Sequence, residues 1–150
     1  MPDLWTLVFC DPEPLSPGAA RRDRVLYWLL AFLKPGFRHV FAMRPTGPGD
    51  GWLIANWHSG RLDLIEALDA VDVGPRRFAD YGAFVAAMAA AGMATTITVA
   101  AGEGRTWRVR GPATCVTAVK HLLAIAAPSA QTPWGLYRHL TAKAAGEDAP

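Results

Sequence analysis

The stretch GFRHVFAMRPTGPGDGWLIANWH, residues 36–58, decides the fold class. Two runs rich in apolar and aromatic residues, 37–43 and 52–58, enclose a segment at 45–51 that holds two prolines and three glycines. Apolar and aromatic runs of this length predict β-strands, and a segment dense in proline and glycine between them predicts a turn. We therefore predict an antiparallel hairpin at the centre of the fold.

Strands and helices are also predicted on both sides of this hairpin. Apolar residues at helical spacing predict a helix over 21–33, and Thr132 followed by Pro133 is a favourable start for a last helix. The other predicted elements are strands at 4–9, 61–68, 95–100 and 106–110, and helices over 80–91 and 114–125. This order predicts an α+β fold in which an antiparallel sheet packs against helices. We expect one domain over residues 1–143 and a flexible tail over 144–150.

Composition narrows the class of protein. The chain has 150 residues, of which 51% are hydrophobic, enough for one domain with a sizeable core. Its net charge of +2, from 15 basic and 13 acidic side chains, does not predict a nucleic-acid partner. The uncharged stretch 83–102 changes from helix-like to strand-like residues at Gly92, so no membrane span is predicted. The N-terminus lacks the pattern of a signal peptide, and we expect a cytoplasmic or virion-associated protein.

Cys115 is the first candidate for chemistry, because it stands at the start of the helix predicted over 114–125. The free N–H groups and partial positive charge of a helix N-terminus favour a thiolate, which is the reactive form of cysteine. The same cysteine shares its helical face with Val119, Leu122 and Leu123, so a buried core cysteine is the competing interpretation.

His39 and Asn56 are the candidates for a partner set. If the hairpin pairs Met43 with Trp52, His39 lies opposite Asn56 on the same face of the sheet. Asn56 would then orient the imidazole of His39, as the third member of a nucleophile–base–orienter set does. A shift of the register by two residues would bring His58 opposite His39 instead.

Three segments together resemble a known family. GFRHV (36–40), WLIANW (52–57) and TCVTAVKHLLAI (114–125) are similar to the circularly permuted papain-like cysteine hydrolases, which include cell-wall peptidases, amidases and lecithin-retinol-acyltransferase-like enzymes. The segment TPWGLYRHL (132–140) is similar to a tail found in small phage-encoded members. The resemblance covers roughly residues 36–57 and 107–140. It implies Cys115 as nucleophile, His39 as base and Asn56 as orienter, in a thiol hydrolase or acyltransferase that acts on an amide, ester or isopeptide bond.

A departure from the family pattern keeps a second function open. Val116 stands where family members often have an acidic or amide residue, and residues 60–94 match no known motif. The alternative is an inactive papain-like scaffold that serves as a structural or adaptor protein, in a phage particle for example. Its partner surface would be sought first at the tryptophans Trp57, Trp107 and Trp134.

No cofactor and no metal are predicted. Cys10, His39, His58 and Cys115 lack the paired spacing of zinc ligands. The expected partners are a peptide or acyl substrate, or a protein in a larger assembly.

Overall fold

The computed structural model describes residues 3–12, 14–47, 51–58, 61–102 and 114–146. The elements follow one another as β1 (Leu4–Cys10), α1 (Arg21–Leu30), β2 (His39–Pro45), β3 (Trp52–His58), β4 (Arg61–Ala67), β5 (Val71–Val73), β6 (Arg76–Phe78), α2 (Tyr81–Ala90), β7 (Ala94–Ala100), α3 (Cys115–Leu122) and α4 (Pro133–Ala144).

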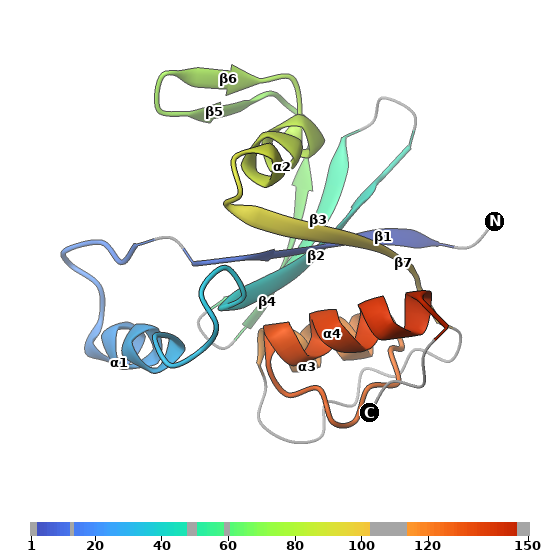
Figure 1. The fold of residues 1–150 in the computed structure, drawn as a ribbon. Helices are drawn as coiled ribbons and strands as arrows, with labels where there is room; N and C mark the ends of the chain where they lie inside the picture. The colour runs from blue at the N-terminus through green and yellow to red at the C-terminus, as the bar shows by residue number, and fades with distance from the viewer. Residues whose placement is uncertain (1–2, 13, 48–50, 59–60, 103–113, 147–150) are drawn as a thin grey trace.

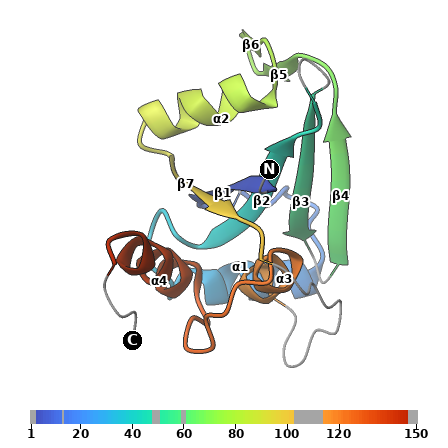
Figure 2. The ribbon, with the colours of Figure 1, turned by 90° about the vertical axis from the view of Figure 1, so that its right-hand side faces the viewer.

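A five-stranded antiparallel sheet forms the centre of the molecule, with the strand order β4-β3-β2-β1-β7. Helix α2 covers one face of the sheet, and helices α3 and α4 lie against the other (Figures 1 and 2). Helix α1 stands to one side of the sheet, on the long connection between β1 and β2 (Figure 1). The predicted α+β class, with an antiparallel sheet packed against helices, is confirmed.

The sheet separates two hydrophobic clusters, because side chains alternate between its faces along each strand. On the face of α3 and α4, β1 and β2 contribute Leu7, Phe9, Val40 and Ala42, which pack with residues such as Val116 and Leu136. On the face of α2, the same strands contribute Val8, Cys10, Phe41 and Met43, which pack with Ile54 and Val85. The side chains at odd-numbered positions of β2 that belong to a cluster therefore face α2.

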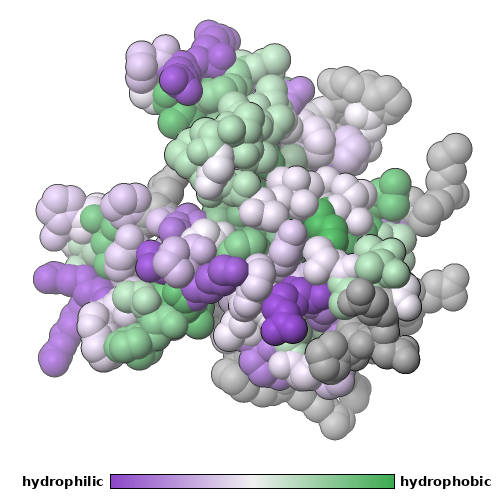
Figure 3. Space-filling model, in the orientation of Figure 1, coloured by the Kyte–Doolittle hydropathy of each residue, from purple (hydrophilic) through white to green (hydrophobic). Residues whose placement is uncertain are grey.

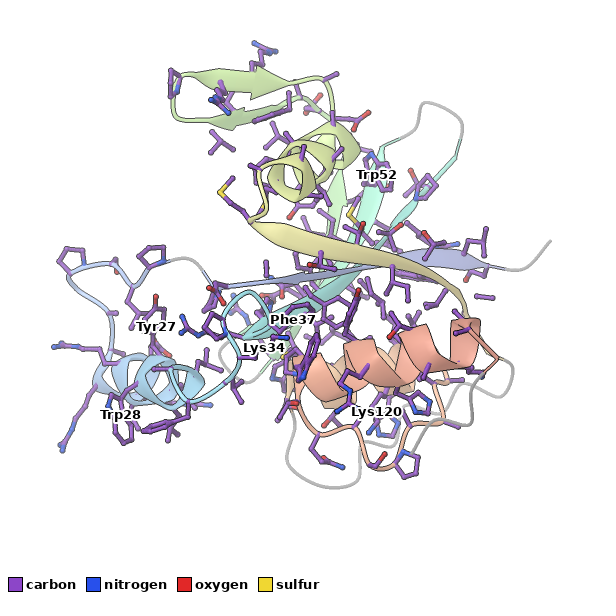
Figure 4. All side chains as sticks on the ribbon, viewed as in Figure 1. Tyr27, Trp28, Lys34, Phe37, Trp52 and Lys120 are labelled. Atoms are coloured by element: carbon purple, nitrogen blue, oxygen red, sulfur yellow. The ribbon has the colours of Figure 1, made fainter. Side chains whose placement is uncertain are left out.

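An aromatic cluster joins the segment before β2 to α4. The Phe37 ring lies 5.8 Å from Phe9, 4.8 Å from Trp134 and 5.0 Å from Tyr137, measured between ring centroids. The ammonium of Lys34 lies 3.1 Å from the centroid of Trp134, and Figure 4 shows Lys34 beside Phe37. Stacked and edge-on rings with a cation over one face stabilise such a junction. It fixes the chain immediately before His39.

Polar side chains define the starts of three helices. The side chains of Asp80, Thr114 and Thr132 accept hydrogen bonds from the backbone N–H groups of Ala83, Thr117 and Gly135, at 2.8, 3.2 and 3.1 Å. Each bond satisfies a donor that the helix itself leaves unpaired. The predicted cap at Thr132 is confirmed, and Cys115 is the first residue of α3.

Several boundaries differ from those predicted. Helix α1 ends at Leu30, although its apolar pattern continues to residue 33. The backbone N–H groups of residues 31–33 donate to carbonyls three residues earlier, which forms single turns in place of a regular helix. The short hairpin of β5 and β6 was not predicted, since strands of three residues carry too little periodicity. The strand predicted at 106–110 lies outside the described residues, as do residues 147–150 of the predicted tail. No helix in the described part of the chain is long and apolar enough to cross a membrane.

Gly82 allows α2 to approach the sheet closely. A Cβ atom at this position would collide with the indole ring of Trp52, which packs against the cluster beneath α2. We expect Gly82→Ala to lower the free energy of unfolding by about 1–3 kcal/mol, as overpacking typically does. Gly18→Ala is the matched control, because a Cβ at Gly18 has no heavy atom within 4 Å. Thermal melts that show equal shifts for both variants would contradict this packing.

Candidate functional site

His39 and Asn56 form the best-defined polar contact among the predicted site residues. Nε2 of His39 lies 2.8 Å from Oδ1 of Asn56, and both residues are partly buried. An amide oxygen accepts only, so Nε2 carries the hydrogen and donates. The ring is thereby held in one tautomer, in which Nδ1 is the unprotonated nitrogen of a neutral imidazole.

The register that produces this contact differs from the predicted one. Met43 pairs with Ile54, and Pro45 pairs with Trp52, a shift of two residues from the expected pairing of Met43 with Trp52. Extending this register places Asn56 opposite Phe41, so Asn56 reaches His39 along the diagonal. Diagonal neighbours on one face of a sheet are within reach of long side chains. His58 ends β3, and its side chain lies outside the described part of the structure.

Cys115 begins α3 on the other side of the sheet. Its side chain is partly exposed and packs against the cluster that contains Val40 and Val116. The thiol also receives hydrogen bonding from the backbone N–H of Val40, the residue that follows His39. The start of α3 therefore lies against the start of β2, which brings the backbone around His39 next to the sulfur.

Burial raises the pKa of the Cys115 thiol above its ordinary value of 9.0. Hydrogen bonding from the backbone N–H groups of Val40, Val116 and Cys115 itself acts in the opposite direction, because it favours the thiolate. Burial dominates, so the thiol is protonated at neutral pH in this arrangement. A nucleophilic role requires a base that removes the proton as the sulfur attacks.

The sheet brings His39 and Asn56 together but turns the His39 side chain away from Cys115. His39 shares its strand face with Phe41, whose ring centroid is 6.4 Å away, and this face is the one covered by α2. The groups that shift the pKa of Cys115 are its buried surroundings and backbone N–H groups, and the His39 ring is not among them. The expected approach of sulfur and imidazole to roughly 4–5 Å stays a prediction.

Cys10 is a neighbour of His39 that the sequence analysis considered only as a zinc ligand and rejected for its spacing. It lies directly opposite His39 in the pairing of β1 with β2, on the same face of the sheet, and is 6% exposed. The signal was available in the alternation of β1, where Val8 and Cys10 share a face. This alternation alone does not predict that Cys10 lies beside His39, because that also requires the pairing of β1 with β2. Among the described residues, no three His, Cys, Asp or Glu side chains are grouped as metal ligands.

Comparisons with protein families, with curated protein sequences and with solved structures found no match. The resemblance to permuted papain-like hydrolases therefore rests on the sequence segments alone and stays a prediction.

Proposed function

We propose that the protein is a papain-like thiol hydrolase or acyltransferase, with Cys115 as nucleophile, His39 as base and Asn56 as orienter. The hydrogen bond of 2.8 Å between Nε2 of His39 and Oδ1 of Asn56 carries the proposal. It leaves Nδ1 as the proton acceptor, the arrangement that a base oriented by a third group requires. The placement of Cys115 at the start of α3, against the backbone of Val40, supports it.

The proposed reaction begins with the neutral thiol. Nδ1 of His39 takes the proton while the sulfur forms a bond to the carbonyl carbon of an amide, ester or isopeptide. Backbone N–H groups at the start of α3 stabilise the oxyanion. The imidazolium then returns the proton to the leaving nitrogen or oxygen, and the thioester passes its acyl group to water or to another acceptor. His39 is the first residue of β2. The proposal requires its ring to turn around this end of the strand and reach the Cys115 sulfur on the other face of the sheet.

A second candidate is the inactive papain-like scaffold, acting as a structural or adaptor protein. Two observations favour it: the raised pKa of Cys115, and the position of His39 on the face covered by α2. In this candidate the His39–Asn56 bond only satisfies two partly buried polar groups.

The rate of Cys115 alkylation as a function of pH separates the two candidates. In the hydrolase, His39 takes the thiol proton as the sulfur attacks, so iodoacetamide should modify Cys115 at about pH 7, well below the ordinary thiol value of 9.0. His39→Ala should slow that modification at least about tenfold, because burial keeps the thiol protonated and no base then removes its proton. Mass spectrometry of the peptides resolves Cys115 from Cys10, which serves as the buried internal control.

The scaffold candidate predicts a different profile. Alkylation of Cys115 would rise only above the ordinary thiol value of 9.0, and wild type and His39→Ala would coincide. That result would exclude the proposed catalytic pair.

A further inference from the structure

Helix α1 turns its apolar side chains toward solvent. Val25, Trp28, Leu29 and Phe32 follow one another at helical spacing and are 51%, 61%, 49% and 72% exposed. Trp28 and Phe32 contact each other edge-on, with ring centroids 4.9 Å apart. No residue of α1 is buried, so the helix uses little of its apolar surface within the chain.

Arginines surround the exposed stripe. Arg21, Arg22 and Arg24 occupy the first turn of α1, all of them exposed, and Arg24 donates to the carbonyl of Ala19. Figure 3 shows hydrophilic and hydrophobic side chains next to each other over the segment that Figure 1 labels α1. We call Val25, Trp28, Leu29 and Phe32 with these three arginines the basic surface.

A surface of the opposite charge lies on the edge strand β4 and the residues that follow it. Leu64 and Leu68 are 56% and 62% exposed, and Glu66 and Asp69 between and beside them are exposed carboxylates. No salt bridge within the described residues involves Glu66 or Asp69. We call these four residues the acidic surface.

The two surfaces together hold most of the exposed apolar side chains. Of the 11 large hydrophobic residues that are exposed in the described part of the chain, seven belong to α1, to Phe32 or to the acidic surface. Exposed apolar patches with a charged border mark interaction sites. Their opposite charges make the two patches complementary to each other.

We propose that the protein associates with itself head to tail, with the basic surface of one copy packed on the acidic surface of the next. A symmetric pairing of α1 with α1 is disfavoured, because it leaves the arginines of both copies without the carboxylates of the acidic surface. The same holds for a pairing of β4 with β4, which gathers the carboxylates. Only the basic-to-acidic contact buries both apolar patches and pairs opposite charges.

The two surfaces point in different directions. Figure 1 shows α1 set to one side of the sheet, and Figure 2 shows β4 at the opposite end of the sheet from β7. A copy that donates its basic surface therefore keeps its acidic surface open for another copy. Such a heterologous contact builds a ring where the rotation closes and a filament where it does not. Cys115, His39 and Asn56 belong to neither surface, so the inference is independent of the proposed function.

Mixing of two half-blocked variants tests the inference. Trp28→Ser/Phe32→Ser removes the apolar centre of the basic surface, and Leu64→Ser/Leu68→Ser removes that of the acidic surface. Light scattering coupled to size-exclusion chromatography, over a concentration series of the full chain, should show assemblies larger than a dimer for the wild type. Each variant alone should be monomeric, with self-association weakened on the order of 100-fold or more. Their equimolar mixture should form dimers and nothing larger, because one open surface of each kind remains.

Charge reversal supplies the second arm. Arg21→Glu/Arg22→Glu/Arg24→Glu and Glu66→Arg/Asp69→Arg should each weaken self-association about tenfold or more. Their equimolar mixture should recover assemblies larger than a dimer, because each variant then meets opposite charge at both surfaces of the other. The matched control is Met93→Ser, which removes an apolar side chain that is 57% exposed and outside both surfaces. It should assemble as the wild type does.

Three outcomes would overturn the inference. A wild type that is monomeric at every concentration removes the second copy as the occupant. Assemblies that persist unchanged in either serine variant place the contact elsewhere. A mixture of the serine variants that stays monomeric, or that forms large assemblies, contradicts the head-to-tail arrangement. Circular dichroism melts of each variant establish that it is folded before its assembly is compared.

Discussion

Replacing Phe9 with alanine is expected to lower the free energy of unfolding by about 3–5 kcal/mol, the range found for deleting a buried aromatic ring. Phe9 is fully buried in β1 on the face of α3 and α4. Its ring lies 5.8 Å from that of Phe37 and 5.5 Å from that of Tyr137, so it supports both the segment before β2 and helix α4. The cavity would open beneath both the segment before β2 and α4. Neither can move to fill it without disrupting the aromatic cluster.

Urea denaturation followed by circular dichroism measures this loss. Phe32→Ala is the matched control, because it deletes the same ring at a position that is 72% exposed. At dilute concentration the control should change the free energy of unfolding by no more than about 0.5 kcal/mol. Similar losses in the two variants would show that Phe9 does not hold the core together.

The sheet was predictable because its strands have the ordinary length and pattern of strands. The runs at 37–43 and 52–58 became β2 and β3, and the run at 61–68 became β4 despite its acidic residues. Those acidic residues fit an edge strand, where one side of the strand faces solvent. The direction in which α1 faces was not predictable, because an apolar stripe at helical spacing normally faces the core. Here the stripe of Val25, Trp28 and Phe32 is exposed.

The candidate site shows a similar division. The contact between His39 and Asn56 was predicted, but through a register that is wrong by two residues. A shift of two preserves the face of every side chain, so the contact survives as a diagonal one. The face of His39 relative to Cys115 could not be predicted, because it depends on which side of the sheet α3 packs. The sequence carries no local signal for that choice.

The largest functional effect is expected from Cys115→Ala. If Cys115 is the nucleophile, the variant loses the only atom that forms the acyl bond, and hydrolysis of 4-nitrophenyl acetate, a generic activated ester, should fall by about a thousandfold or more. Its stability should change little, because the side chain is only partly buried at the start of α3 and alanine is a better helix former. Stopped-flow absorbance should show a burst of nitrophenolate in the wild type and none in the variant.

Cys10→Ala controls for the second thiol, since Cys10 is buried on the other face of the sheet and should leave the burst intact. His39→Ala should remove the burst at neutral pH, where the protonated Cys115 thiol depends on the imidazole for activation. If Cys115 is instead a core residue, Cys115→Ala costs on the order of 1 kcal/mol or more in the free energy of unfolding. A lowered melting temperature, together with no burst in the wild type, would contradict the hydrolase and leave the scaffold as the function of this fold.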